Sequence, residues 1–144
     1  MTEKYGTRYN QGKIDLTQLS PLAQKLESLV FMYGQGKYGR NNWKNFKKTE
    51  DEAVMEMLQC ALRHIMAYQE GEFFDKESKM PHLTHAVWNL NRINDVYFYG
   101  MTHGKDGKDL FHQPLRNELP PIPTSQNFKE IWGFEPKGFE TKKE

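Results

Sequence analysis

Six of the ionisable side chains in the stretch RHIMAYQEGEFFDKESKMPHLTHAVWN (63–89) gather where one helix is expected to end and the next to begin. They are His64, Glu72, Asp75, Glu77, His82 and His85. Carboxylate oxygens bind hard divalent cations such as Mg²⁺ and Mn²⁺, and imidazole can orient water or donate a proton. Such a cation can neutralise a triphosphate and activate water for attack on phosphorus. The stretch therefore favours metal-dependent phosphate chemistry, with ordinary surface charge on a loop between helices as the alternative.

A second group of side chains, in GQGKYGRNNW (34–43), suits a nucleotide. Cations, amides and a flat ring are what a phosphate and a base would need, and the candidates here are Lys37, Tyr38, Arg40, Asn41, Asn42 and Trp43. The glycines formally match G-x-G-x-x-G, but a dinucleotide site requires a preceding strand, and a helical pattern precedes this segment. The alternative is a structural loop whose glycines adopt positive φ.

The helix that leads into the acidic stretch is expected over residues 49–71. Thr49 to Glu52 fits a capping box, and an acidic first turn suits the helix dipole. Apolar residues recur at three-to-four-residue steps and predict a buried face; they are Val54, Leu58, Ala61, Leu62 and Ile65. Glu50, Glu56, Gln59, Arg63 and Glu70 fall opposite and are expected in solvent.

The same helical projection places Tyr68 and Glu72 on the apolar face. A buried carboxylate costs free energy unless it is paired or binds a cation, so this position favours a metal ligand. The alternative is that Gly71 ends the helix and Glu72 turns into water.

A further helix is expected over residues 81–99, with Pro81 at its first position. Its predicted buried stripe is Leu83, Ala86, Val87, Leu90, Ile93 and Tyr97. His82, His85 and Asn89 form a polar strip along the edge of that stripe. Trp88 falls on the side away from the stripe, where a partner could cover it.

The first helix is expected over residues 20–33, because Ser20 can cap it and Pro21 suits its first position. Its apolar stripe consists of Leu22, Leu26, Leu29, Val30 and Tyr33. Glu27 lies off this stripe and is expected at the surface, and Gly34 is expected to end the helix.

The ends of the chain look irregular. Residues 1–19 suggest an extended arm, 102–109 a polar turn and 119–125 a proline-rich segment, while 127–134 suits a short amphipathic turn. We therefore expect a helical domain over residues 1–100 and a C-terminal extension over 101–144 that packs on the core or on a neighbouring subunit.

Composition excludes several classes of protein. The chain has 144 residues and a net charge of +1, so no basic field points to nucleic acid. The single cysteine, Cys60, cannot form an internal disulfide or a cysteine-based zinc site. The absence of a long apolar run and of a signal peptide predicts a cytoplasmic protein without a membrane partner. His-Asp, H-E-x-x-H and G-x-S-x-G motifs are absent from the sequence.

Four segments together resemble a known family: KYGRNNW (37–43), LRH (62–64), GEFFDKES (71–78) and HLTHAVWN (82–89). Over about residues 5–100 the chain resembles the phage and bacterial dATP/dGTP diphosphohydrolase domain of the MazZ type. The resemblance implies an all-α, MazG-like helical bundle with an irregular C-terminal tail. It also implies that Mg²⁺ or Mn²⁺ supports cleavage of a purine deoxynucleoside triphosphate to the monophosphate and pyrophosphate. The resemblance further implies a homo-oligomer, either a dimer or a tetramer, in the cytoplasm of a phage host.

The expected roles follow from both the residues and the resemblance. The expected catalytic residues are Glu72, Asp75 and His64, and the expected metal ligands are Glu72, Asp75, Glu77 and His82. Lys37, Tyr38, Asn42, Trp43, Arg63 and Asn89 are the expected substrate-binding residues. MazG-like enzymes typically carry E-x-x-E on the preceding helix, whereas Glu52 and Glu56 here are four residues apart. A nucleotide-binding protein without turnover is therefore the main alternative, and a helical interaction protein is a weaker one.

Overall fold

The computed structural model describes residues 12–40, 42–44, 49–101 and 110–138, and these residues form an all-α fold. Four α-helices and two short 3₁₀-helices lie within those ranges, and the pairing between Phe74 and Pro81 is an isolated bridge rather than part of a strand. The predicted all-α class is therefore confirmed. The predicted turn at 102–109, most of the N-terminal arm, and Asn41 lie outside the described residues.

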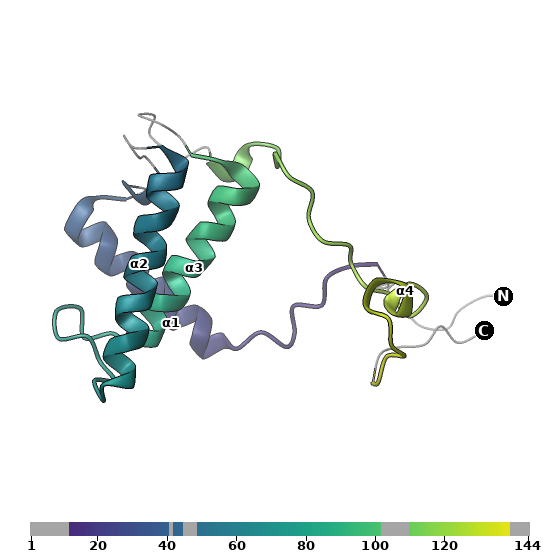
Figure 1. The fold of residues 1–144 in the computed structure, drawn as a ribbon, viewed down its shortest axis with the longest axis horizontal. Helices are drawn as coiled ribbons and strands as arrows, with labels where there is room; N and C mark the ends of the chain where they lie inside the picture. The colour runs from purple at the N-terminus through teal and green to yellow at the C-terminus, as the bar shows by residue number, and fades with distance from the viewer. Residues whose placement is uncertain (1–11, 41, 45–48, 102–109, 139–144) are drawn as a thin grey trace, which may run out of the picture. The chain divides into compact units, whose positions relative to one another are not determined.

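Two compact units divide the chain, and each is described by itself. The helical unit spans residues 19–118 and contains α1 (Pro21–Tyr38), α2 (Glu50–Gln69) and α3 (His82–Tyr99), as Figure 1 shows. It also contains the 3₁₀-helices η1 (Asn42–Lys44) and η2 (Leu110–His112). The second unit joins residues 1–18 to 119–144 and contains α4 (Phe128–Trp132).

The predicted capping residues Ser20 and Thr49 stand at the N-termini of α1 and α2. The Ser20 hydroxyl accepts a hydrogen bond from the Ala23 amide at 3.1 Å, and Thr49 accepts from the Glu52 amide at 3.3 Å. These caps satisfy amides that have no partner inside the helix. Pro81 is the residue before α3 rather than its first position, so the third helix begins at His82.

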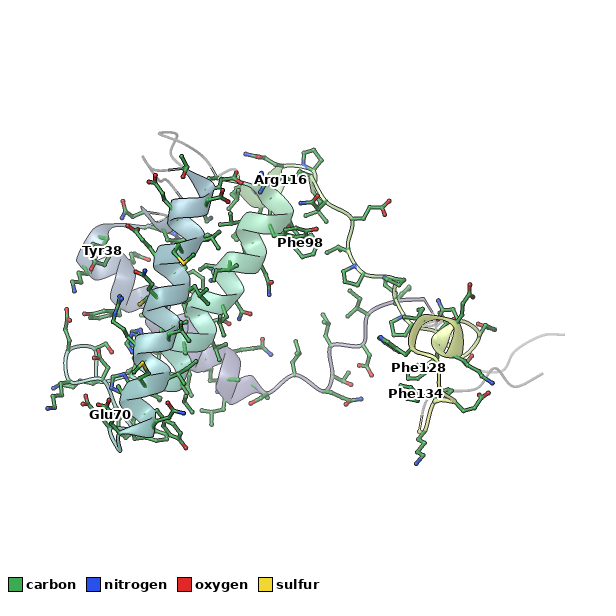
Figure 2. The ribbon with its side chains drawn as sticks, in the orientation of Figure 1. Tyr38, Glu70, Phe98, Arg116, Phe128 and Phe134 are labelled. Carbon is green, nitrogen blue, oxygen red and sulfur yellow. The ribbon has the colours of Figure 1, made fainter. Side chains whose placement is uncertain are left out.

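Helix α1 runs further than the sequence predicts, so the expectation that Gly34 ends it was wrong. Gly34 and Gly36 lie inside the helix, which continues to Tyr38 (labelled in Figure 2) and stops at Gly39 with φ +92°. A glycine inside a helix costs only about 1 kcal/mol. The Lys37 ammonium offsets part of this cost in two ways. It lies in the last turn of α1, where a positive charge suits the helix dipole, and it forms an ion pair with Glu77.

Helices α2 and α3 pack side by side and run in opposite directions (Figure 1), while α1 packs against α3. Their buried apolar residues are Ala53, Met57 and Ala61 of α2, Ala86 and Val96 of α3, and Val30 of α1. Arg116, which Figure 2 labels near Phe98, joins the two long helices at one end. Its guanidinium donates to both Glu50 carboxylate oxygens, at 2.9 and 2.7 Å, and to the Val96 carbonyl at 2.8 Å.

The predicted buried stripes of α2 and α3 were largely wrong, because much of each stripe is exposed. Leu62 is 49% exposed and Val87 is 50% exposed, whereas the polar strip His82, His85 and Asn89 is buried. Periodicity identifies the apolar side of a helix but not which side its own chain covers. The exposed set, called the apolar outer face below, consists of Met55, Leu58, Leu62, Met66, Leu83, Val87, Leu90 and Tyr97.

The second unit contains the predicted short amphipathic element. Phe128 contacts Trp132 and Phe134 edge to face, with ring centroids 4.7 and 5.3 Å apart. The packing of this unit on the helices or on another subunit stays a prediction. In the described part of the chain, none of the helices has the length and hydrophobicity needed to cross a membrane.

Candidate functional site

A cleft of about 1560 Å³ lies within the helical unit, between the three long helices and the connection from α2 to α3. This volume exceeds that of a typical small-molecule pocket, which is about 300–1,000 Å³, so the cleft can hold a nucleotide. Most of the predicted site residues line it; these are Lys37, Tyr38, Asn42, Trp43, Arg63, His64, Asp75, Glu77 and Asn89. Glu72 and His82 do not line the cleft but lie directly behind His64.

Three histidines from α2 and α3 form a cluster beside the cleft. The Nδ1 atoms of His64 and His82 lie 2.7 Å apart, so one imidazole donates and the other accepts. His64 also stacks on His85, with ring centroids 4.5 Å apart and planes 8° from parallel. The other nitrogen of His82 faces Glu72 at 3.2 Å. Glu72 therefore lies beyond the end of α2, but its carboxylate faces the histidine cluster. It pairs with His82 and is not fully solvated.

Asp75 lies in a tight turn in the connection between α2 and α3. Its amide donates to the Met80 carbonyl and its carbonyl accepts from the Lys79 amide, each at 2.8 Å, while the His82 amide donates to Phe73 at 2.9 Å. These bonds fix the backbone around the carboxylate. The connection can therefore position a catalytic group more firmly than an irregular loop would.

The Asp75 carboxylate belongs to a polar network with Ser78 and His85. It accepts from the Ser78 amide at 2.8 Å and lies 3.9 Å from His85 Nε2, which itself lies 2.6 Å from the Ser78 hydroxyl. Burial acts to raise the pKa of Asp75, but the Ser78 hydrogen bonds and the neighbouring His85 and His64 outweigh it and lower that pKa. Asp75 is therefore ionised at neutral pH, ready to bind a cation or accept a proton from water.

Lys37 and Glu77 close one side of the cleft with an ion pair between the last turn of α1 and the α2–α3 connection. The hydrogen bond from Lys37 lowers the pKa of Glu77, and the same bond raises the pKa of Lys37. The predicted phosphate-binding cation and one predicted metal ligand are thus bound to each other. A nucleotide or a metal ion that uses either group would have to replace this pair.

Acid is expected to destabilise the protein through its histidine cluster. Burial lowers the pKa of His64 to about 4, and the nearby His85 and His82 act in the same direction; burial also lowers the pKa of His85. The unfolded chain therefore takes up a proton near pH 6.5, while folded His64 takes it up only near pH 4. Stability should be full above pH 6.5 and fall as the pH drops toward 4, by about 2 kcal/mol between pH 7 and 5 from His64 alone.

Urea unfolding at several pH values, with a chelator present, measures this slope. His64→Gln should flatten it, while His112→Gln in η2 should leave it unchanged. An unfolding free energy for the unmodified protein that is constant between pH 7 and 5 would contradict the assignment of a neutral His64.

Aromatic rings line the other part of the cleft. Phe31 and Trp88 meet edge to face with centroids 5.3 Å apart, and Trp43 lies 6.1 Å from Trp88 and 6.3 Å from Phe111. The prediction that Trp88 lies at the outer surface was wrong, because α3 turns its indole toward α1 and η1 instead. These rings form an aromatic wall of edge-to-face contacts, and a base could stack on the exposed face of one of them.

Arg92 of α3 stands behind this wall and is only 8% exposed. Its guanidinium pairs with Glu27 at 3.1 Å and Asp95 at 2.9 Å, so the prediction that Glu27 is a free surface group was wrong. Burial lowers the pKa of Arg92 and raises that of Asp95, while the two charges oppose both shifts. The pair thus keeps a cation buried beside three aromatic rings.

Four residues in or beside the cleft were absent from the predicted site: Phe31 and Glu56, which line it, and Ser78 and Arg92, which contact residues that line it. The buried polar strip on α3 continues from Asn89 to Arg92, so its helical spacing could have pointed to this arginine. Glu56 lines the cleft from the side of α2 that was assigned to solvent. Ser78 lies three residues after Asp75, a spacing typical of a side-chain-capped turn.

The four predicted metal ligands do not surround one point. Glu72 faces His82, Glu77 binds Lys37, and Asp75 accepts from Ser78. Among the described residues, no three His, Cys, Asp or Glu side chains are arranged to hold a metal ion. Metal binding at these positions stays a prediction.

Comparison with known proteins agrees with the resemblance seen in the sequence. A protein of Salmonella phage PMBT28 named dATP/dGTP diphosphohydrolase is 28% identical over 85 residues, which cover 59% of this chain and 27% of that protein. The chain thus spans about a quarter of the length of this relative. No solved structure gives a significant match. The family described as dATP/dGTP diphosphohydrolase, N-terminal, matches residues 3–103, and because this is more than half of the sequence, the chain belongs to that family.

Proposed function

We propose that the chain hydrolyses a purine deoxynucleoside triphosphate, dGTP or dATP, to the monophosphate and pyrophosphate. The observation that carries this proposal is the composition of the cleft, which has an aromatic wall and a group of ionisable side chains in one space. A nucleotide requires both, because its base stacks on flat rings and its phosphates need charge compensation. Family membership supports the purine substrate.

Within this proposal the two parts of the cleft take different parts of the substrate. Phe31, Trp43 and Trp88 would contact the base, and Asn42 and Asn89 can hydrogen-bond to polar edges. Lys37, Arg40 and Arg63 would bind the phosphates. His64 and Asp75 lie at the phosphate side, where a group that orients or deprotonates water is needed.

We further propose that Mg²⁺ or Mn²⁺ assists hydrolysis. Three carboxylates, Glu56, Asp75 and Glu77, line the cleft and supply the hard oxygen atoms that these ions prefer. Bound there, an ion would neutralise phosphate charge and lower the pKa of a water molecule. Because the described donors are not arranged as one shell, we assign no coordination geometry to the ion.

Incubation with a panel of deoxynucleoside triphosphates tests the function. In the presence of Mg²⁺ or Mn²⁺ we expect dGTP or dATP to yield the monophosphate and pyrophosphate, and we expect a chelator to stop the reaction. Release of inorganic triphosphate or of single phosphates would contradict the proposed bond cleavage.

Binding without turnover would favour the alternative, a nucleotide-binding protein. The specific observation behind that alternative is the ion pair between Lys37 and Glu77, which occupies two predicted functional groups. Calorimetry with dGTP in parallel with the product assay separates the two functions.

We also propose that the apolar outer face binds a second copy of this chain. On each helix the exposed strip falls on the side opposite the cleft-lining residues, which include Cys60 and His64 of α2 and His85 and Asn89 of α3. No charged residue interrupts either strip, so the face can meet its own copy without like-charge repulsion. A standard interface buries about 800 Å² per partner, and eight side chains that are 37–57% exposed can supply most of that area.

A further inference from the structure

Arg92 contacts three rings at once. Its guanidinium carbon lies 4.5 Å from the centre of the Phe31 ring and 5.2 Å from those of Trp43 and Trp88. Each distance is within the range of a cation–π contact, and burial strengthens such contacts because water does not compete for the charge. All three rings line the cleft, but Arg92 itself does not.

The charge of Arg92 is anchored on the side away from the rings. Glu27 of α1 accepts from the guanidinium at 3.1 Å and from Asn91 at 3.1 Å, and Asp95 lies 2.9 Å from Nε. A planar guanidinium can bind carboxylates along its edge while its faces remain available for rings, which an ammonium group cannot do. Arg92 therefore joins α1, η1 and α3, whose rings also contact one another edge to face.

Trp43 depends on these side-chain contacts more than its neighbours do. It lies in η1, a three-residue 3₁₀-helix, whereas Phe31 and Trp88 lie within long helices. Within the described residues, the Asn42 amide at the start of η1 donates to the Gly39 carbonyl at 3.3 Å. Such short helices have poor hydrogen-bond geometry and contribute little rigidity of their own.

We propose that Arg92 is a positioning residue, whose guanidinium holds Trp43 and Trp88 in the edge-to-face arrangement against which a purine base stacks. This inference rests on the proposed function and extends it, because it assigns base affinity to a residue that does not touch the substrate. The physical reason is that a fixed ring pair loses little conformational freedom when the base binds, whereas a mobile indole must first be ordered.

Arg92→Lys is the main test, because lysine keeps the positive charge but removes the planar fork. We expect the KM and Kd for dGTP to rise about tenfold, the scale of one buried cation–π contact, with a change in kcat of less than about twofold. Binding of inorganic triphosphate, which reaches only the phosphate side, should stay unchanged. The near-ultraviolet circular dichroism of the tryptophans should weaken even without ligand.

Arg116→Lys is the matched control. Arg116 also joins elements through a carboxylate and backbone carbonyls, but none of its contacts is with an aromatic ring that lines the cleft. This variant should leave the tryptophan signal and both affinities unchanged. If Arg92→Lys does not fold, Glu27→Gln takes its place, since it keeps the guanidinium and weakens one anchor. It should raise the Kd for dGTP in the same direction, by about threefold.

The outcomes separate the inference from the proposed function. Equal loss of dGTP and triphosphate binding in Arg92→Lys would mean a merely structural role and overturn the inference, as would unchanged dGTP binding. If the unmodified protein binds no nucleotide, the proposed function fails and with it the purine assignment. The tryptophan signal of Arg92→Lys against that of Arg116→Lys then still decides whether Arg92 orders the rings.

Discussion

Asp75→Asn is expected to reduce hydrolysis of dGTP and dATP at least about 1000-fold, because several kcal/mol of transition-state stabilisation depend on its charge in the cleft. Glu72→Gln is expected to reduce hydrolysis as well, but less, because it removes a charge that faces His82 outside the cleft. Both changes keep the size of the side chain. Asparagine at position 75 can still accept from the Ser78 amide, so the turn should survive. Glutamine at position 72 can still meet His82, which lies 3.2 Å from the present carboxylate. Both variants should therefore lose activity while they remain folded.

Glu70→Gln is the matched control for these two variants. Glu70, which Figure 2 labels at the end of α2, is an exposed carboxylate two residues before Glu72 and does not line the cleft. Its replacement should leave turnover unchanged. Rates are compared at saturating nucleotide and metal, with circular dichroism of each variant as the check on folding. Rates equal to that of the unmodified protein would transfer the catalytic assignment from the carboxylates to His64 and His85.

Leu62→Lys should dissociate the proposed assembly. Leu62 lies in the middle of the α2 strip of the apolar outer face and is 49% exposed in the single chain. In a twofold assembly each charge would be buried against the partner, at a cost of at least about 3 kcal/mol, or more than about 100-fold in the dissociation constant. Sedimentation should show a single chain of 17.0 kDa for the variant and a multiple of that mass for the unmodified protein.

Ser28→Lys adds the same charge on the exposed side of α1 and should leave the assembly intact. A monomer for the unmodified protein at micromolar concentration would refute the pairing of outer faces. It would instead favour another protein as the partner that covers that face.

Helix positions were the most predictable part of this fold. Ser20, Thr49 and the apolar periodicity placed the starts of three helices and the ends of α2 and α3 close to their true positions, because a capped amphipathic helix is specified by residues near one another in sequence. Gly34 was misread because the pairing of Lys37 with Glu77, which helps α1 to continue, joins residues 40 apart.

The site was less predictable than the helices. Composition and spacing pointed to His64 and Asp75, which both line the cleft. They could not show that Glu72 faces His82 rather than the cleft, since that depends on how the α2–α3 connection folds back. Arg92 escaped notice because an arginine on a helix is usually solvent-exposed, and only the assembled rings reveal its role.

The two glycines inside α1 lower the stability of the part of this helix that lines the cleft. Gly34 and Gly36 precede Lys37, and each lowers helix stability by about 1 kcal/mol relative to alanine. The last turn of α1 can therefore unwind locally at a free-energy cost well below that of global unfolding. Such fraying would release Lys37 from Glu77 while the packing of α2 on α3 stays intact. Entry to the phosphate side would then be governed by the melting of one helical turn and would need no movement of whole helices.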